Sequence, residues 1–182
     1  MAPNSSLSSS LSIKLCFTFM LAFLALSATA KPRPPCKEKK LTLYAQDIAV
    51  GAPNATNMIV AGPGNWTFGT IIVVEDRVTE RVSNNSRLVG KLQGFYVTAS
   101  RDSQSVNIYV SLAFTTGAFN GSTLEIQGRS LKLAKVREYA IIGGTGKFRF
   151  ATGYVTFETI FLDQTTLYNI ERVNLTVVYG CY

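Results

Sequence analysis

Asp47 is the residue whose surroundings in this sequence most favour chemistry. Residues 41–49 read as a strand, in which every second side chain shares one face, and that face carries Leu41, Leu43, Ala45, Asp47 and Ala49. A carboxyl group at the end of an apolar row points into an interior or a cavity mouth, where lost hydration raises its pKa. Such a group can donate a proton near neutral pH. The competing interpretation of the same pattern is an aspartate that caps a turn at the strand end.

One arginine and four aromatic residues extend this candidate set. Arg137 shares a predicted strand face with Tyr139 and Ile141, and an inward arginine can pair with an acid or a ligand oxygen. A flat phenolic ligand would find aromatic surface on two strands that we expect to be neighbours, at Phe95, Tyr96, Tyr109 and Phe114. The alternatives are an arginine at a solvated strand edge and rings that only fill the core.

The chain contains no histidine, and this absence excludes several mechanisms. Ser-His and Cys-His nucleophile pairs, histidine metal sites and imidazole acid–base catalysis all require that residue. A zinc site would need cysteines that we expect to be bridged. We therefore predict no metal site and no cofactor, and any chemistry has to come from carboxyl groups, tyrosines, arginine or lysine.

The segment from Arg137 to Phe157 contains Gly143-Gly144-Thr145-Gly146 between two apolar runs. A phosphate-binding loop would need a helix directly after the glycines, so that its N-terminal N–H groups face the phosphate. The following residues are aromatic and β-branched, with no helical spacing of apolar side chains. The segment therefore predicts a β-hairpin rather than a nucleotide site.

The remaining apolar runs predict an all-β domain with no convincing helix. Together with the hairpin, about eight strands are expected, over residues 41–49, 68–74, 87–99, 106–115, 122–126 and 167–179. Their spacing is typical of an antiparallel barrel or sandwich. Gly90 and Gly94 are expected to mark bends or bulges. The Asn120-Gly121 pair predicts a tight hairpin, because both residues tolerate positive φ.

The N-terminus predicts export. A basic flank, an apolar run over residues 15–26 and a small-residue end read as a signal peptide over residues 1–30, cut after Ala30. An extended leader at residues 31–40 would then precede the domain at residues 41–182. Cys36 and Cys181 lie at opposite ends of that mature chain, and an oxidising compartment favours joining them over leaving two free thiols.

Five acceptor sequons for N-glycosylation agree with a secreted, extracellular protein. Their asparagines are Asn54, Asn65, Asn84, Asn120 and Asn174. The net charge of the chain is +7, without a basic stripe interleaved with stacking aromatics, so nucleic acid is not expected as a partner. After signal cleavage no membrane association is expected. Attraction to an acidic wall polymer such as pectin fits the sign of the charge.

Five longer motifs occur in a fixed order. They are Leu43-Tyr44-x-x-Asp47-Ile48, Phe68-Gly69-Thr70, Leu88-Val89-Gly90-x-x-Gln93-Gly94-Phe95-Tyr96, Phe119-Asn120-Gly121-Ser122-Thr123-Leu124 and Val136-Arg137-Glu138-x-x-Ile141-Ile142-Gly143-Gly144-Thr145-Gly146-x-Phe148. In this order they resemble the plant dirigent proteins over nearly all of the predicted mature chain, terminal cysteines included. Each motif alone is weak, but the set is specific.

The resemblance implies an eight-stranded antiparallel β-barrel with a central cavity, of the allene-oxide-cyclase-like kind. It also implies secretion to the apoplast and a homo-oligomer, dimer or trimer. Family members steer phenoxy radicals from monolignols such as coniferyl alcohol into one lignan stereoisomer, while a separate oxidase or laccase makes the radicals. A related group consists of dehydratases that form pterocarpans from isoflavonoid quinone methides. A non-catalytic wall or defence protein that binds polymer or lipid is the third hypothesis.

By position, the resemblance assigns the proton-donating acid to Asp47, a cavity tyrosine to Tyr96, and the partner of the acid or ligand to Arg137. The sequence also departs from the lignan-forming members. Ser130 stands where these have a second aspartate, and by that position it is predicted to contact the ligand; Thr98 stands where they have a second cavity tyrosine. Thr152 replaces an arginine found in many members after the glycine loop. The chain therefore resembles the broader dirigent-like branch.

Overall fold

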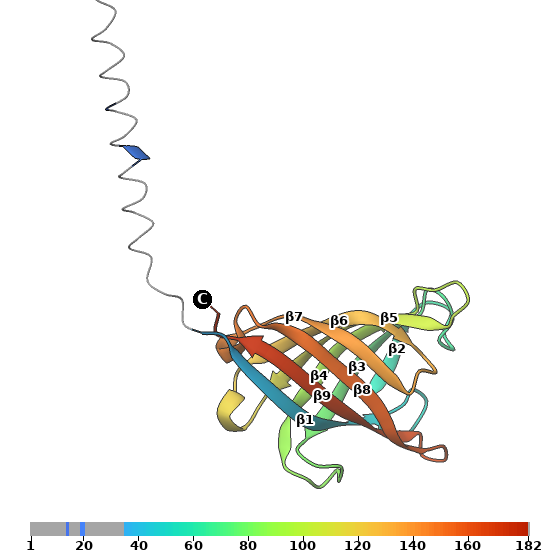
Figure 1. The fold of residues 1–182 in the computed structure, drawn as a ribbon. Helices are drawn as coiled ribbons and strands as arrows, with labels where there is room; N and C mark the ends of the chain where they lie inside the picture. Colours follow the sequence, from blue (N-terminus) through green and yellow to red (C-terminus); the bar gives the residue numbers. More distant parts are fainter. Residues whose placement is uncertain (1–13, 15–18, 21–34, 182) are drawn as a thin grey trace, which may run out of the picture. The chain divides into compact units, whose positions relative to one another are not determined.

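The structure is a computed structural model that describes residues 14, 19–20 and 35–181. The predicted signal peptide lies outside the described residues except for Lys14, Phe19 and Met20. Residues 35–181 form an all-β domain without an α-helix (Figure 1). Among the described residues, no helix has the length and apolar character needed to span a membrane.

The domain contains nine strands and two 3-10 helices. In chain order these are β1 (Lys37–Ile48), β2 (Asn57–Ala61), β3 (Ile71–Thr79), β4 (Leu88–Val97), β5 (Ser105–Phe114), η1 (Gly117–Phe119), β6 (Thr123–Leu131), β7 (Val136–Gly144), η2 (Gly146–Phe148), β8 (Thr152–Asp163) and β9 (Tyr168–Tyr179). From β3 to β9, each strand pairs antiparallel with the next, and β1 pairs with both β9 and β3. These pairings close eight strands into the predicted antiparallel barrel, whereas β2 pairs with β3 beyond the end of β1.

Several boundaries differ from the predictions. β1 begins at Lys37, so residues 37–40 of the predicted leader pair with the end of β9. β2 was not predicted, because its five residues lie between glycine- and proline-rich breaks. The prediction of a tight Asn120-Gly121 turn is wrong: Asn120 has a φ of −48° and follows η1, and only Gly121 has a positive φ.

Alternation of inward and outward side chains forms the core. On β9, Val173, Leu175 and Val177 face inward and are at most 1 % exposed, while Asn174 and Thr176 face outward. On β4, Gly90 lies so close to β5 that an added Cβ would meet the Ala113 carbonyl oxygen at 2.1 Å. The pairing of β3 with β4 shifts register opposite this residue, so the predicted irregularity at Gly90 is confirmed.

One end of the barrel, where β1 begins and β9 ends, is filled by aromatic rings; we call it the closed end. The rings of Phe114, Phe119, Phe148 and Tyr179 contact one another with centroid separations of 4.7–5.5 Å. The predicted disulfide between Cys36 and Cys181 is present at this end, with its Cα atoms 4.5 Å apart.

The predicted hairpin of the glycine segment is confirmed as β7–β8, and its loop belongs to the closed end. Gly146 has a φ of +58°, and an added Cβ would lie 2.6 Å from Ser122 Oγ. Only glycine fits this tight turn, and the turn places Phe148 inside the barrel, where it is fully buried. The glycines of this loop therefore allow the tight packing of the closed end.

Candidate functional site

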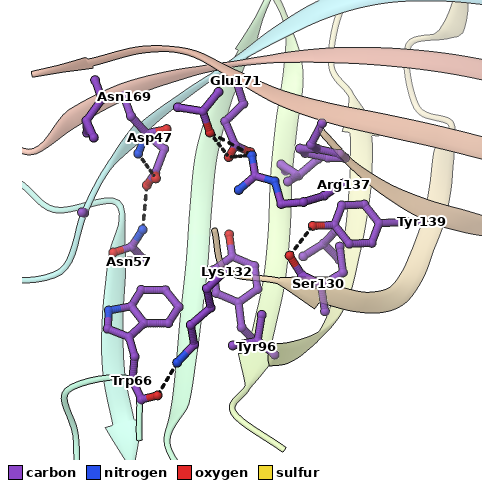
Figure 2. Close-up of a pocket in the computed structure, with 18 residues that line it drawn as sticks. Asp47, Asn57, Trp66, Tyr96, Ser130, Lys132, Arg137, Tyr139, Asn169 and Glu171 are labelled. Carbon is purple, nitrogen blue, oxygen red and sulfur yellow. Dashed lines mark hydrogen bonds and ion pairs between the residues drawn. The ribbon is translucent and has the colours of Figure 1, made fainter. Parts of the chain in front are cut away.

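The opposite end, where β1 ends and β9 begins, contains a cavity of about 490 Å³; we call it the open end. This volume lies within the range of small-molecule sites. Side chains from eight strands and three loops line it (Figure 2): Asp47, Ala49, Asn57, Trp66, Leu92, Tyr96, Val106, Ile108, Val110, Ser130, Lys132, Arg137, Tyr139, Phe157, Thr159, Leu162, Asn169 and Glu171. The predicted residues Asp47, Tyr96, Ser130 and Arg137 are thus brought together in one pocket.

Asp47 faces the cavity from β1, as the alternation predicted, with Leu43 and Ala45 buried on the same face. Its Oδ1 accepts hydrogen bonds from Asn57 Nδ2 at 2.6 Å and from Thr56 Oγ1 at 3.2 Å, and its Oδ2 accepts one from Asn169 Nδ2. Burial raises the pKa of Asp47, while these donors and the charge of Arg137 partly offset the rise. The carboxyl group is fixed in orientation and poised to exchange a proton.

A second carboxyl group, Asp76 on β3, lies next to this site and was missed by the sequence reasoning. Asp76 is 3 % exposed, and its Oδ1 lies 2.5 Å from Thr56 Oγ1, the hydroxyl that also contacts Asp47. Burial raises its pKa well above the usual value, and the charges of Asp47 and Glu171 raise it further. The signal was present: Ile72, Val74, Asp76 and Val78 alternate along β3, and all four are buried.

The Thr56 hydroxyl can link these two acids. It already accepts the backbone N–H of Ile48 at 3.0 Å and has only one proton to donate. Thr56 Oγ1 therefore cannot donate to both carboxyl groups. The raised pKa of Asp76 favours a protonated carboxyl group there, and a protonated Asp76 can donate to Thr56, which can then donate to Asp47.

Arg137 on β7 points inward and pairs with Glu171 on β9. Its Nη2 lies 2.5 Å from Glu171 Oε1 and donates to Thr159 Oγ1 at 2.9 Å. Burial raises the pKa of Glu171, and Arg137 lowers it by a smaller amount. Arg137 is therefore held by an acid of the protein, and not at a solvated edge. Glu171 was missed, although it continues the inward row of Val173 and Leu175.

The side of the cavity away from these acids is aromatic. Trp66, from the loop between β2 and β3, stacks on Tyr96 with ring centroids 6.2 Å apart and planes at 22°. Burial raises the pKa of Tyr96, and the charges of Asp76, Asp47 and Glu171 add to that rise, so the phenol stays neutral. Ser130 Oγ accepts a hydrogen bond from the Tyr139 hydroxyl at 2.8 Å on the adjoining wall.

Three predicted ligand-binding rings do not line the cavity. Phe95 and Tyr109 stack on each other at 5.1 Å, and Phe95 is 41 % exposed on the outer face of the barrel. The prediction that they face the interior is wrong, because neighbours in a strand point to opposite faces and Tyr96 takes the inward place. Phe114 does face inward, but it belongs to the aromatic cluster of the closed end.

The sequons and the positions that depart from the family pattern are also placed. Asn54, Asn65, Asn84 and Asn120 are exposed in loops, whereas Asn174 is half-buried on the outer face of β9 and accepts a hydrogen bond from Thr42 Oγ1. Thr98 is buried at the open end, and its hydroxyl has no hydrogen-bond partner. Thr152 is exposed at the start of β8, at the closed end. Within residues 35–181, no group of three or more acidic, cysteine or histidine side chains is arranged to hold a metal ion.

The comparisons with known proteins agree with this architecture. The family model described as dirigent-like protein matches residues 38–178. The chain belongs to the dirigent family. It is 38% identical over 151 residues to Dirigent protein 7 of Arabidopsis thaliana, covering 80% of this chain and 77% of that protein.

Pterocarpan synthases are similarly close to this dirigent protein. Pterocarpan synthase 1 of Glycyrrhiza echinata is 38% identical over 138 residues, covering 71% of this chain and 73% of the relative. The solved structure of the pterocarpan synthase dirigent protein GePTS1 aligns with a TM-score of 0.74 and 36% identity, covering 83% of this chain and 93% of that one. The relatives thus include a protein named as a dirigent protein and proteins named as pterocarpan synthases.

Proposed function

We propose that this dirigent protein guides phenoxy-radical coupling: it binds phenolic radicals from monolignols such as coniferyl alcohol and directs them to one optically active lignan. The observation that carries the proposal is an unfilled cavity with stacked rings on one side and the linked acids Asp47 and Asp76 on the other. A separate oxidase or laccase supplies the radicals. The protein's contribution to rate and selectivity is the orientation of reactants that would couple without it.

Coupling of two such radicals forms a carbon–carbon bond and leaves two quinone methides. When a side-chain hydroxyl attacks the electrophilic carbon of a quinone methide, the carbonyl oxygen takes up a proton and the ring becomes aromatic again. The attacking oxygen releases one proton, so no net proton is consumed. Asp47 would deliver the first proton, and Asp76 would restore it through the Thr56 hydroxyl that contacts both acids.

A second candidate function is a pterocarpan-type dehydratase, favoured by the similarity in sequence to pterocarpan synthase 1 of Glycyrrhiza echinata and in fold to the solved structure of GePTS1. In that reaction an isoflavanol loses its hydroxyl group as water, passes through a quinone methide, and closes a ring. Asp47 would protonate the leaving hydroxyl. Both candidates use Asp47 as the acid and pass through a quinone methide, but only radical coupling needs an oxidant.

The coupling proposal is tested with coniferyl alcohol, a laccase and chiral chromatography of the lignans. We expect an enantiomeric excess that rises with protein concentration, and loss of this excess in Asp47→Asn. Glu75→Gln is the matched control, because Glu75 is an exposed acid on the outer face of β3, outside the cavity. A racemic product at saturating protein would refute the proposal for this substrate.

The dehydratase candidate is tested with an isoflavanol and no oxidant. Turnover under these conditions would assign the protein to the second candidate function. We then expect Asp47→Asn to lose at least about a hundredfold in turnover, the usual range for a removed general acid. Full turnover by that variant would exclude Asp47 as the acid.

The proposal also covers the localisation, the glycosylation and the assembly of the protein. Secretion to the apoplast, glycans on the exposed sequons and a homo-oligomer are expected, and the Cys36–Cys181 disulfide supports an oxidising compartment. A wall or defence protein that only binds polymer is the third candidate, and the unfilled cavity favours a small-molecule ligand over it. Secretion assays and light scattering of the purified protein test localisation and assembly.

A further inference from the structure

Lys132 occupies an unusual position at the cavity of this protein. It follows β6 at the open end, lines the cavity and is half-buried. Its Nζ donates to the Trp66 carbonyl oxygen at 2.5 Å and lies 5.8 Å from the centroid of the Trp66 ring. In Figure 2 the Lys132 ammonium group reaches Trp66 at one side of the pocket, while Asp47, Glu171 and Arg137 lie at the other.

The two cations of the cavity differ in their partners. Arg137 is paired with Glu171, so its charge is already balanced. Among the ion pairs of residues 35–181, none involves Lys132. Burial lowers the pKa of Lys132, and the charge of Asp102 offsets part of this effect. An ammonium group has three N–H donors, and the contact with the Trp66 carbonyl uses one.

We propose, building on the function above, that the preferred ligand is a phenolic acid: an aromatic ring whose side chain ends in a carboxylate, bound by Lys132. The ring would pack beside Trp66 and Tyr96, which form the aromatic wall. The phenol oxygen would then face Asp47. A neutral monolignol would fill the same space without using the lysine charge.

Charge also dictates the orientation of such a ligand. Asp47, Asp76 and Glu171 share the far side of the site, where Arg137 forms its ion pair with Glu171. A ligand carboxylate placed there would add another acidic group to this cluster and raise the pKa values of its members further. Beside Lys132 the same carboxylate gains a charge-assisted hydrogen bond in a partly desolvated environment.

The experiment compares three ligands with the same ring: 3-(4-hydroxy-3-methoxyphenyl)propanoate, its primary amide and the corresponding alcohol. Affinity is measured by titration calorimetry on the full mature protein. Trp66 is the only tryptophan of the chain, so its fluorescence reports whether each ligand binds at this wall. We expect the acid to bind about tenfold more tightly than the amide or the alcohol, as for a hydrogen bond to a charged group.

Lys132→Met should abolish this preference, because the charged contact with the ligand carboxylate is lost. The affinity for the alcohol is the internal reference for any effect of losing the hydrogen bond to the Trp66 carbonyl oxygen. Lys132→Arg should keep most of the preference. Lys135→Met is the matched control: Lys135 is 82% exposed and pairs with Glu158 at 3.7 Å, outside the cavity. Added salt should weaken binding of the acid and leave that of the alcohol unchanged.

Equal affinities of the wild-type protein for acid and amide would overturn the proposal, even if a variant failed to fold. An acid preference that survives in folded Lys132→Met would overturn it as well; Lys132 would then only anchor the loop through the Trp66 carbonyl. The chiral assay of coupling is a separate readout. Racemic lignans together with acid-selective binding would refute the coupling function and leave this inference standing.

Discussion

The two ends of the barrel are built from the same alternating strands but filled in opposite ways. At the closed end, four inward rings contact one another, and Phe148 among them is fully buried. At the open end the inward positions carry carboxyl, amide and hydroxyl groups around about 490 Å³ of unfilled space. The packed closed end therefore stabilises the fold, while the open end keeps a cavity that its side chains do not fill.

Buried polar atoms without a hydrogen-bond partner also distinguish the open end from the closed end. Within residues 35–181, four buried side-chain polar atoms lack a partner: Asn57 Oδ1, Thr98 Oγ1, Arg137 Nε and Asn169 Oδ1. All four belong to residues at the open end. Each such atom destabilises the folded protein unless water or a ligand satisfies it. Stability given up at a binding site in this way is a common trade-off in proteins.

The largest effect on stability is expected from removing a ring from the aromatic cluster of the closed end. Phe148→Ala should lower the free energy of unfolding by about 3–5 kcal/mol, because the variant leaves a cavity among Phe114, Phe119 and Tyr179. Denaturant titration measures this. Ile142→Ala on the outer face of β7, where Ile142 is 58% exposed, should cost less than about 1 kcal/mol. Similar losses in both variants would show that the ring cluster is not what stabilises this end.

Next in size is the disulfide, which also belongs to the closed end. Replacing Cys36 and Cys181 together by serine should lower the unfolding free energy by about 2–4 kcal/mol, because the bridge restricts the unfolded chain across 145 residues. Ligand affinity, measured by calorimetry, should stay unchanged, since the bridge is at the other end from the cavity. A loss of ligand affinity in the folded variant would contradict the independence of the two ends.

The sequence predicted more of the closed end than of the open one. Alternation along β9 and the glycine turn before Phe148 are local patterns, so the strands and the hairpin could be predicted from them. The disulfide was predicted from the positions of the two cysteines and an oxidising compartment. At the open end, Asp47 and Arg137 were found because each shares a strand face with a row of mostly apolar side chains. Asp76 and Glu171 lie on similar rows, but their approach to Asp47 depends on barrel closure, which joins residues far apart in the chain.

The outward placement of Phe95 shows why the aromatic wall was only partly predicted. The Phe95-Tyr96 pair carries two adjacent rings, and the register of β4 against its neighbours decides which ring faces inward. Trp66 lies in a loop rich in glycine and proline, where no periodicity applies. The local sequence pattern therefore indicates which residues could line the cavity, and the closure of the sheet decides which of them do.

A smaller effect is expected on the pH dependence of stability, to which buried Asp76 and its exposed strand neighbour Glu75 should contribute differently. Burial raises the pKa of Asp76 above 3.8, so the folded state binds its proton more tightly than the unfolded state does. Stability should therefore fall as pH rises from the ordinary aspartate pKa through the folded one. We expect Asp76→Asn to flatten this fall in a series of melting temperatures from acid to neutral pH.

Glu75→Gln is the matched control for that series. Lys91 and Gln93 lower the pKa of Glu75 on the outer face, so its contribution is lost as pH falls and has the opposite sign. The decline toward neutral pH should persist in this variant. An undiminished decline in Asp76→Asn would show that Asp76 is already ionised in the folded protein.

The smallest effect concerns the hydrogen bond from Tyr139 to Ser130 at the cavity wall. Tyr139→Phe should cost about 0.5–1.5 kcal/mol in urea unfolding, because the ring still packs against Phe157 at 5.3 Å and only the hydroxyl contact is lost. A double-mutant cycle with Ser130→Ala isolates that contact. A coupling energy near zero would mean that water replaces the bond without cost, so that this wall, unlike the ring cluster around Phe148, is already hydrated in the folded protein.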